Sequence, residues 1–392
     1  MDQGSPSQLM RHTESAVRIV DELQRYHRQI LLDDIGESGQ RRLLQSHALI
    51  VGGGALGTMI ADALVRAGVG TLSIIDRDTV ELTNLQRQVL YDEDDVAQVI
   101  PKAKAAKNKL ARINSQVVVH GHVDDFSARN AERYIEGVDV VLDGLDNFET
   151  RYLLNDVAVK HGLPYVYGGA VGTTGMSFLV LPHPKCRADP SHSSVRWSAE
   201  QSTPCLRCVF PEAPPPGASP TCDTAGVLGA AVAIIAAHQC TQAIKLLTGN
   251  LDKVDRSLLS IDVWSNQQRT LDIISARDSD DCPCCVQGDL AYLEGRAGGA
   301  VTSLCGRHAV QITPGPDGSE PKRLDLAAMA SQLSPHGSFT QNAYLMHGRF
   351  SNERGANGEP MELTLFPDGR AIIKGTDDLG TARSIYAKYI GA

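Results

Sequence analysis

The stretch Ala48-Leu-Ile-Val-Gly-Gly-Gly-Ala-Leu-Gly57 decides the fold of this chain. Its apolar start predicts a buried strand, and the glycines that follow fit the pattern GxGxxG just before a helical run from Thr58. Such a turn lets backbone N–H groups and the helix N-terminus approach a phosphate. The glycines that we expect to bind a nucleotide are Gly52, Gly53, Gly54 and Gly57. A Gly-rich turn with a purely structural role is the alternative.

Strands and helices alternate on the C-terminal side of this turn. The predicted strands are 71–75, 117–120, 138–143, 165–167 and 176–181, with two more within 258–274. The predicted helices are 102–113, 149–161 and 225–247, and residues 13–45 also have a helical pattern. This alternation predicts a Rossmann-like, doubly wound α/β fold with a mainly parallel sheet.

The character of the sequence changes near Gly288, and Gly295-Arg-Ala-Gly-Gly299 has the composition of a linker. We therefore expect a first domain of residues 1–287, a linker of residues 288–300 and a small α+β domain of residues 301–392. Within the first domain, residues 182–204 are rich in Pro, His, Ser and charge, and we expect an exposed loop there.

Composition excludes some classes of protein. The chain has 392 residues, 42% of them apolar, and a net charge of −9, which argues against a general nucleic-acid binder. No uninterrupted apolar run is long enough to cross a membrane, and the N-terminus lacks the pattern of a secretory signal. We expect a cytoplasmic protein with no membrane partner.

Two aspartates follow the second strand. Asp76 ends that strand about twenty residues after the glycine turn, where a carboxylate accepts hydrogen bonds from ribose hydroxyls. Asp78 lies two residues further on. By itself, this arrangement would favour NAD as the nucleotide.

The residues beyond them change that preference to ATP. A triphosphate needs several concentrated donors, whereas the diphosphate of a dinucleotide is served mainly by the helix N-terminus. Arg87 and Lys102 supply positive charge, and Asn84 and Gln88 supply neutral donors. A solvated polar helix face is the alternative explanation of this pattern.

The run Asp143-Gly-Leu-Asp-Asn147 lies at the C-terminal end of a buried strand, where doubly wound sheets bind their ligands. Carboxylates there are suited to holding Mg²⁺ against phosphate oxygens. Capping of the next helix by Asp146 or Asn147 is the alternative.

Nine cysteines include two pairs with CxxC spacing, Cys205-Leu-Arg-Cys208 and Cys282-Pro-Cys-Cys285. Four thiolates on two such pairs are typical of a structural, tetrahedral Zn²⁺ site. An unliganded thiol cluster or a redox pair is the alternative. Cys284 could replace Cys282 or Cys285, although only the latter two have the usual spacing.

Taken in order, these motifs resemble the ubiquitin-activating-type superfamily, and within it the ThiF- and MoeB-like adenylyltransferases of sulfur carriers. The resemblance covers residues 24–286. It also includes Arg25-Tyr-His-Arg28-Gln29, Pro101-Lys102 and Cys222-Asp-Thr-Ala-Gly-Val227. It implies that ATP and Mg²⁺ are used to adenylylate the C-terminal glycine of a ubiquitin-like carrier that ends in Gly-Gly. An ionised carboxylate needs no general base, so catalysis would rest on positioning and charge neutralisation.

The resemblance also implies residue roles. Asp76 would bind ribose, Asp146 would hold Mg²⁺, and the triphosphate would be held by Asn84, Arg87 and Lys102. Arg28 would reach across a homodimer interface into the ATP site of the neighbouring chain. The loop 182–204 lies where the family covers the carrier tail, but its length and its Cys186 depart from the shorter bacterial forms. We therefore assign that loop no role.

Cys222 precedes a predicted helix, whose N-terminus would favour a thiolate. In ThiF-like relatives a cysteine at this position forms a covalent sulfur link to the carrier, whereas in MoeB-like relatives it is dispensable. A half-buried thiol without a chemical role is the alternative. A cysteine desulfurase or a rhodanese is the expected kind of sulfur donor.

Other functions remain open. The same fold could activate a carboxylate on tRNA or on a peptide, the chain could be an NAD-dependent oxidoreductase, or it could be a zinc-stabilised scaffold without a reaction. In the C-terminal domain, Cys305-Gly-Arg-His308 lies too near the start of the domain for a rhodanese active loop. That domain would recruit the carrier or a sulfur donor, or it would stabilise the dimer.

Overall fold

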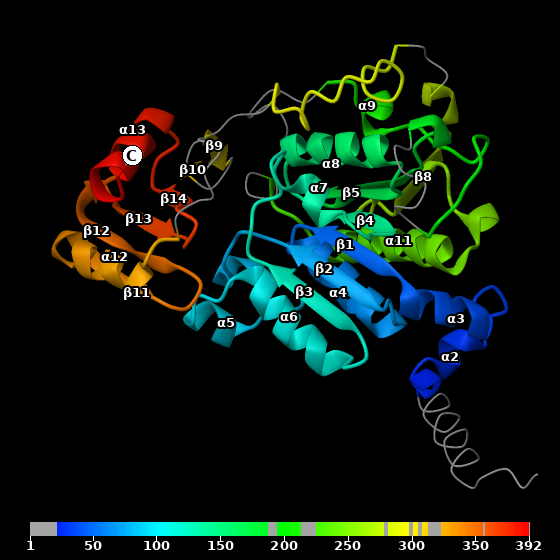
Figure 1. The fold of residues 1–392 in the computed structure, drawn as a ribbon, viewed down its shortest axis with the longest axis horizontal. Coiled ribbons are helices and arrows are strands. Elements are labelled where there is room, and N and C mark those ends of the chain that lie inside the picture. The colour runs from blue at the N-terminus through cyan, green and yellow to red at the C-terminus, as the bar shows by residue number, and fades with distance from the viewer. Residues whose placement is uncertain are drawn as a thin grey trace, which may run out of the picture. The chain divides into compact units, whose positions relative to one another are not determined.

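The computed structural model describes most of the chain. The described residues are 22–186, 194–212, 225–277, 281–297, 301–304, 308–312, 323–355 and 357–391. They form two compact units (Figure 1). The first takes in the described residues up to Glu212 together with Val227–Glu294, and the second takes in the described residues from Gly295 onward together with Ala225 and Gly226. Each unit has its own sheet and its own hydrophobic core.

The first unit contains an eight-stranded sheet with the order β3-β2-β1-β4-β5-β6-β7-β8. Its strands are β1 (His47–Val51), β2 (Thr71–Ile75), β3 (Val118–His122), β4 (Val140–Asp143), β5 (Tyr165–Val171), β6 (Thr174–Val180), β7 (Leu258–Asp262) and β8 (Gln267–Leu271). The strands β3, β2, β1, β4 and β5 are parallel, in the order of a doubly wound nucleotide-binding half. The predicted α/β fold with a parallel sheet is confirmed for these strands.

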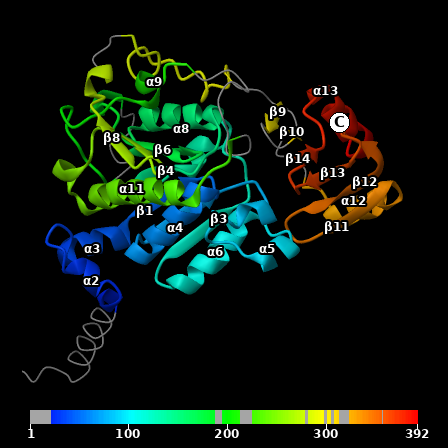
Figure 2. The same ribbon diagram turned by 180° about the vertical axis from the view of Figure 1, so that it is seen from behind.

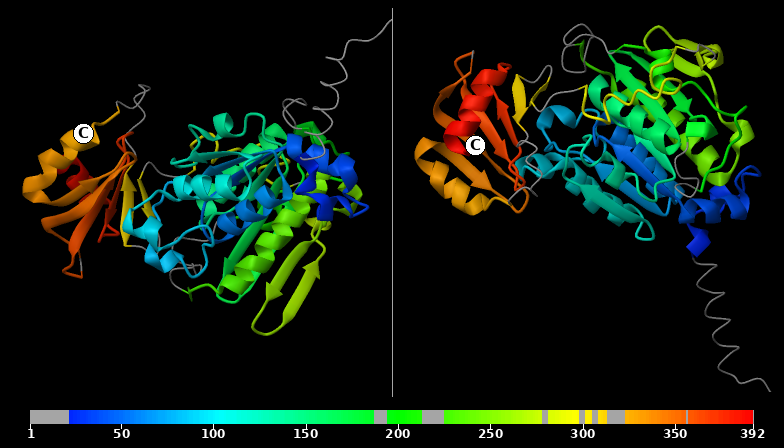
Figure 3. Two further views of the ribbon diagram at one scale, coloured as in Figure 1. Left: turned by 90° about the horizontal axis from the view of Figure 1, so that it is seen from below. Right: turned by 45° about the horizontal axis from the view of Figure 1, so that its top comes forward.

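The other end of this sheet is antiparallel. The strand β6 pairs antiparallel with β5, and β7 and β8 continue the meander as a hairpin (Figure 3). The sequence predicts strands in this region, but the alternation of apolar residues does not encode their direction. The sheet is therefore mixed, with the parallel part next to the glycine turn.

Helices cover both faces of the sheet (Figures 1 and 2). They are α2 (His27–Ile30), α3 (Gly36–Gln45), α4 (Ala55–Ala67), α5 (Glu93–Ala97), α6 (Lys102–Ile113), α7 (Ala131–Tyr134), α8 (Phe148–His161), α9 (Leu206–Val209) and α11 (Gly229–Thr248). Successive residues of β1 point to opposite cores. Ile50 packs with α4, α6 and α11, whereas Leu49 packs with α7 and α8. A parallel sheet that is buried on both faces explains why Ala48 to Val51 of β1 are all apolar.

The helix α11 is the central core helix of the first unit. It has 20 residues, and among the described helices it alone has the length and composition to cross a membrane. Its residues Ile235 and Ala243, within the helix 225–247 that the sequence predicts, are fully buried with α4 and the sheet. Gly249 follows it with a left-handed φ of 86°, a conformation that commonly ends a helix.

Two sequence-based expectations need correction. The loop 182–204 is not exposed throughout, because Trp197 is buried and its indole N–H donates to the Pro182 carbonyl oxygen at 2.8 Å. Thr203 is also buried, and its hydroxyl donates to the Leu179 carbonyl oxygen at 2.6 Å. Of the predicted helical segment 13–45, residues 13–21 lie outside the described residues, and in the rest turns separate α2 from α3.

The start of the expected linker packs onto the first unit. Tyr292 stacks on Tyr152 with ring centroids 5.1 Å apart, and the Tyr292 backbone N–H donates to Asp156 at 3.0 Å. Leu293 is buried in the same core. The segment that leaves the first unit therefore begins at Gly295 rather than at residue 288. The assignment of two domains with separate roles remains a prediction.

The second unit is an antiparallel sheet with the order β11-β12-β13-β14-β10-β9. Its elements are β9 (Val301–Leu304), β10 (Ala309–Ile312), α12 (Leu326–Leu333), β11 (Gly337–Gln341), β12 (Met346–Arg354), β13 (Pro360–Leu365), β14 (Ala371–Lys374) and α13 (Leu379–Tyr389). Side chains of both helices share one core with Phe350 and Leu363 of the sheet. This is the small α+β unit that the sequence predicts. Cys305, Gly306 and Arg307 lie outside the described residues.

Candidate functional site

The glycine turn between β1 and α4 has no room for a side chain at Gly52 or Gly57. Gly52 has a left-handed φ of 95°, and a Cβ on it would lie 2.5 Å from the carbonyl oxygen of Gly144. A Cβ on Gly57 would lie 1.9 Å from the carbonyl oxygen of Gly52. Gly54 is the N-cap of α4 and supplies no side-chain cap. The first N–H groups of α4 therefore face the carboxyl edge of the sheet, where a phosphate could accept their hydrogen bonds.

Asp76 directly follows β2, beside this turn. One of its carboxylate oxygens accepts the Gly53 N–H at 2.7 Å, and the other accepts the Asp78 N–H at 2.7 Å. Burial raises the pKa of Asp76, and the nearby Lys102 ammonium opposes that rise. Each oxygen retains acceptor capacity for a ribose hydroxyl. Tyr91 completes the arrangement, because its hydroxyl donates to the Gly53 carbonyl oxygen at 2.8 Å.

Lys102 is the first residue of α6 and is almost completely buried. Its ammonium Nζ lies 3.3 Å from Oδ2 of Asp78, and its backbone N–H donates to the Asp78 carbonyl oxygen at 2.8 Å. A buried ammonium needs a counter-charge, so this pair fixes a cation beside Asp76. The structure thus brings together the predicted residues Gly53, Asp76, Asp78 and Lys102.

Arg77 is a second cation at this edge, which we did not predict. Its guanidinium lies 2.9 Å from Asp125 and 3.9 Å from Asp78. Burial alone would lower the pKa of Arg77, but Asp125, Asp78 and Asp146 together raise it. The position between two predicted aspartates in Asp76-Arg-Asp78 is the sequence signal that could have identified it.

The segment after β2 carries the remaining predicted donors. Asn84 ends the short 3₁₀ helix Leu82–Asn84, and its side-chain oxygen accepts the Glu81 N–H at 3.1 Å. Gln88 is buried, and its Oε1 has no hydrogen-bond partner within the described part of the chain. Arg87 is half-buried and donates to the Thr83 carbonyl oxygen at 2.9 Å. These side chains follow one another along a single turn of backbone.

The turn between β4 and α8 carries two carboxylates that differ in their exposure to solvent. Asp143 is completely buried, and its carboxylate accepts hydrogen bonds from Leu145 N at 2.9 Å, Arg151 Nε at 3.1 Å and Tyr165 Oη at 2.7 Å. Burial raises the pKa of Asp143, whereas Arg151 and Tyr165 lower it. Asp146, in contrast, is exposed. Asp146 is therefore the carboxylate of this turn that solvent and a Mg²⁺ ion can reach.

Asn147 is the N-cap of α8, which is the alternative that the sequence left open. Its side-chain oxygen accepts the Thr150 N–H at 2.9 Å. Its amide nitrogen donates to Oδ1 of Asp146 at 3.3 Å. Asn147 thus both starts the helix and orients the exposed aspartate.

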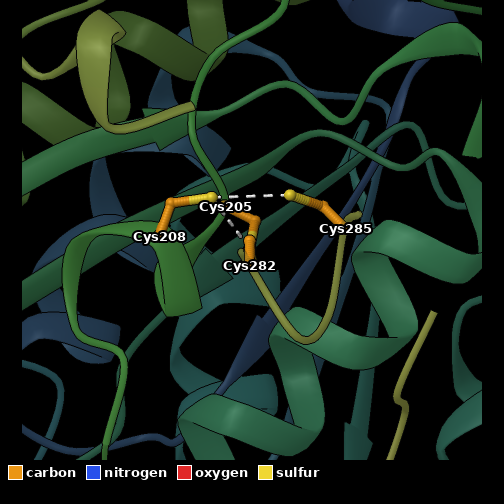
Figure 4. Close-up of side chains that lie close together, drawn as sticks. All are labelled: Cys205, Cys208, Cys282 and Cys285. Atoms are coloured by element: carbon orange, nitrogen blue, oxygen red, sulfur yellow. Dashed lines mark hydrogen bonds between the residues drawn. The ribbon is translucent and has the colours of Figure 1, made fainter. Parts of the chain in front are cut away.

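The four predicted cysteines form one cluster in the first unit (Figure 4). The Sγ atoms of Cys205, Cys208, Cys282 and Cys285 all lie within 4.8 Å of one another. The closest Sγ pairs are Cys205–Cys282 at 3.6 Å, Cys205–Cys208 at 3.7 Å and Cys208–Cys285 at 3.4 Å. Tetrahedral Zn–S bonds of about 2.3 Å place sulfurs about 3.8 Å apart, so the cluster fits such an ion.

Cys284 does not belong to this set of four. Its thiol is buried and lies 3.3 Å from Asn155 Nδ2 and 3.4 Å from Asp156 Oδ1, both on α8. Its thiol therefore contacts α8, although it also interacts with the Cys205 thiol. This geometry agrees with the spacing argument for Cys282 and Cys285 as the second pair.

Arg28 is not brought to the nucleotide edge of its own chain. It lies exposed on α2, and its neighbour Gln29 donates to the carbonyl oxygen of Ala67, at the C-terminal end of α4, at 3.0 Å. The nucleotide turn lies at the other end of α4, which has 13 residues. A helix of that length separates its ends by about 18 Å. Cys222, the remaining predicted site residue, lies outside the described residues.

Comparisons with known proteins agree with this geometry. The family model described as "ThiF family" matches residues 26–284. The "Sulfur carrier protein ThiS adenylyltransferase" of Bacillus subtilis is 43% identical over 368 residues, which cover 94% of this chain and 99% of that protein. The "SAMP-activating enzyme E1" of Haloferax volcanii is 37% identical over 70% of this chain and 92% of that protein.

One solved structure supports the fold. In the crystal structure of E. coli MccB with MccA-N7isoASN, the protein superimposes with a TM-score of 0.54 at 20% identity. The match covers 67% of this chain and 74% of that chain. At this identity the likeness concerns the fold alone.

Proposed function

The chain belongs to the ThiF family, and from that membership we infer that it adenylylates the C-terminal glycine carboxylate of a ubiquitin-like sulfur carrier. ATP would be consumed as its Mg²⁺ complex, and pyrophosphate would be released. The ThiS adenylyltransferase relative aligns along 94% of this chain, second unit included. A carrier of the ThiS kind, with a Gly-Gly end, is therefore the first substrate to test.

One observation carries this proposal. At the carboxyl edge of the parallel strands, the N-terminus of α4, the ribose-accepting Asp76 and the buried ammonium of Lys102 are linked through Asp78. The exposed Asp146 lies in the turn just after β4, the strand that pairs with β1. This edge combines anion donors with a carboxylate for a divalent cation, which is what a magnesium triphosphate requires.

The chemistry needs position and charge rather than a nucleophilic side chain. The glycine carboxylate of the carrier is ionised at neutral pH and attacks the α-phosphorus directly. An oxygen–phosphorus bond forms to the carboxylate, and the bond to the leaving pyrophosphate breaks. Lys102, Arg87 and Asn84 would hold the phosphate oxygens as negative charge moves onto the leaving group. Asp146 would hold Mg²⁺, which would neutralise part of that charge when bound.

A structural Zn²⁺ belongs to the same proposal. The donors would be Cys205, Cys208, Cys282 and Cys285, whose sulfur spacing fits a tetrahedral ion. Four thiolates leave no open coordination position, so the ion would hold two distant segments together and would take no part in the reaction.

We also propose that the active form is a homodimer in which Arg28 serves the ATP site of the partner chain. The position of Arg28 at the far end of α4 supports an action in trans, because it cannot serve its own site. Exposed apolar residues beside the nucleotide edge support an interface there. They are Leu82, Val89, Leu228 and Ile234.

The partners beyond the carrier follow from the expected sulfur chemistry. A cysteine desulfurase or a rhodanese would replace the adenylate with sulfur, and Cys222 would take part if the chain follows the ThiF-like rather than the MoeB-like scheme. We place the reaction in the cytoplasm, where cysteines remain reduced and available to a metal.

Exchange of labelled pyrophosphate into ATP tests the function. Full-length protein with MgATP should catalyse exchange only when a Gly-Gly-ended carrier is added, and a carrier that lacks its last glycine should be inactive. Exchange without any carrier, or a complete failure of exchange with binding of NAD instead of MgATP, contradicts the proposal.

A further inference from the structure

The helix α8 carries three polar side chains on one face. Asn147, Arg151 and Asn155 follow one another at intervals of four residues, a spacing that aligns side chains along a helix. Asn147 and Arg151 contact the turn that displays Asp146. Asn155 lies two helical turns beyond Asn147 and is completely buried. The same face therefore runs from the nucleotide edge toward the cysteine cluster.

Asn155 holds both cysteine-bearing segments. Its side-chain oxygen accepts the backbone N–H of Leu206, which lies between Cys205 and Cys208, at 2.7 Å. Its amide nitrogen donates to the thiol of Cys284, which lies between Cys282 and Cys285, at 3.3 Å. An amide offers an acceptor and donors from one side chain, so a single residue can hold two segments that are far apart in sequence.

Asp156 reinforces one of these attachments. Its Oδ1 accepts the Cys284 thiol at 3.4 Å, and its Oδ2 accepts the backbone N–H of Tyr292 at 3.0 Å. The second CxxC segment is therefore fixed to α8 at two adjacent positions. Both carboxylate oxygens point into the fold, where Asp156 is fully buried.

The other end of α8 is fixed just as firmly to the nucleotide turn. Arg151 donates to the carbonyl oxygens of Leu145 at 2.7 Å and Gly168 at 2.9 Å, in addition to its ion pair with Asp143. Leu145 directly precedes Asp146. A displacement of α8 along or about its axis would therefore move the exposed aspartate.

We propose that Asn155 is a positioning residue for the four-cysteine metal site, and that α8 couples the state of this site to the turn that displays Asp146. The proposal rests on the metal site proposed above. With the metal bound, the two CxxC segments are rigid and hold α8 through Asn155. When the metal is lost, the segments separate, and the helix and the turn at its N-terminus loosen together.

Zinc release tests the first part. Purified full-length wild type and Asn155→Ala should be loaded with one Zn²⁺ per chain and challenged with a colorimetric chelator. Loss of such a supporting hydrogen-bond partner typically weakens metal binding about 10- to 100-fold, and we expect release to accelerate by a similar factor. Asn114→Ala is the matched control, because Asn114 is also a completely buried asparagine but holds Tyr26 and Val65. It should keep the wild-type release rate.

Hydrogen exchange tests the second part. Chelator-stripped wild type should exchange the amides of residues 143–147 faster than the zinc-loaded protein, while the amides of β2 stay protected. Unchanged exchange in residues 143–147 overturns the coupling. A wild-type release rate in Asn155→Ala, or an equal acceleration in Asn114→Ala, overturns the positioning role.

Two further variants keep the test decisive if Asn155→Ala fails to fold. Asn155→Asp keeps the acceptor for Leu206 and loses the donor to Cys284, and Cys284→Ala removes the other side of that contact. Each variant should release zinc faster than wild type, but by a smaller factor than the one expected for Asn155→Ala. Wild-type release rates in both variants overturn the proposal. If the wild-type protein binds no zinc, both the proposed metal site and this inference are wrong. If the protein binds zinc but shows no carrier-dependent pyrophosphate exchange, only the proposed reaction is wrong.

Discussion

The backbone N–H of Gly53 donates to a carboxylate oxygen of Asp76 at 2.7 Å, so the glycine turn and Asp76, the groups that we propose bind phosphate and ribose, are fixed to each other directly. A site that is ordered in this way loses little further entropy when the nucleotide binds. The arrangement depends on the close approach of two backbone segments at the carboxyl edge, namely the glycine turn after β1 and the segment after β2.

Gly57→Ala should destabilise the first unit and abolish ATP binding. The new Cβ would lie 1.9 Å from the Gly52 carbonyl oxygen, which belongs to backbone and cannot rotate away. Overpacking of this kind costs about 1–3 kcal/mol, and here it would also move the turn. Gly229→Ala is the control, since its Cβ would meet its nearest neighbour at an ordinary 3.5 Å. Thermal unfolding and MgATP titration should separate the two variants, and equal behaviour contradicts the prediction.

Lys102→Ala should lower carrier-dependent pyrophosphate exchange by about 10²- to 10³-fold, the usual effect of removing one charge-stabilising donor. The variant leaves Asp78 and Asp76 without the ammonium that faces them. Lys109→Ala is matched to it, because Lys109 also lies on α6 and also pairs with two aspartates, Asp92 and Asp95. Exchange should stay near the wild-type rate in that control. A comparable loss in both variants indicates a general effect on α6 instead.

Asp143 and Arg151 form a buried ion pair whose disruption should be costly. Arg151→Met leaves the Asp143 carboxylate buried without its cation, which typically destabilises by about 3–5 kcal/mol. In the double variant Arg151→Met, Asp143→Asn, the charge is absent and most of that loss should be recovered. Chemical unfolding of the single and double variants measures the coupling. Additive losses contradict a direct pairing.

The sequence predicts the parallel half of the fold well, because β1, β2 and β4 are short, mostly apolar runs bounded by turn residues. It also predicts the cysteine cluster, since the spacing within each CxxC pair restricts the geometry. It cannot distinguish Asp143 from Asp146, two carboxylates in one turn. The distinction depends on Tyr165, which lies 22 residues further on and reaches Asp143 only in the folded chain.

The direction of β6 to β8 and the role of Asn155 were beyond the sequence for the same physical reason. Alternating apolar residues indicate which face of a strand is buried, but not which neighbour it joins. A buried asparagine in a helix has no distinctive pattern, and its two contacts lie 51 and 129 residues away. Contacts of this kind become visible only when the tertiary structure brings the segments together.

Acidification should destabilise the first unit through His238. Burial lowers the pKa of His238 below its ordinary value of 6.5, and Asp255 only partly offsets this effect. Ser177 and Gln242 also face the ring, which lies 3.0 Å from the Ser177 hydroxyl and 3.3 Å from the Gln242 amide. Because the unfolded chain binds the proton more tightly, this contribution to stability is complete above about pH 6.5 and declines below it.

Comparison with His238→Gln isolates that titration. The melting temperature of wild type minus that of the variant should fall when the pH is lowered from about 7.5 to about 5, because only wild type binds the extra proton on unfolding. A difference that does not change with pH contradicts the lowered pKa. Other groups titrate in both proteins and cancel in the difference.

Arg28 provides the sharpest test of the dimer. Arg28→Ala should fold normally, since Arg28 is exposed on α2, yet it should lose exchange activity if its guanidinium completes the partner's site. Lys102→Ala should be inactive as well, for lack of a cation in its own site. Neither variant alone should recover activity at any protein concentration.

A mixture of the two variants distinguishes action in trans from action in cis. In a mixed dimer, the Arg28→Ala chain keeps its own Lys102 and receives Arg28 from the partner, so one of the two sites is complete. Random assortment makes half of the dimers mixed, so activity should return to about a quarter of the wild-type value. If Arg28 acted within its own chain, every site in every dimer would lack one of the two cations. A mixture that stays inactive after subunit exchange has been demonstrated therefore contradicts the shared site, whatever the oligomeric state.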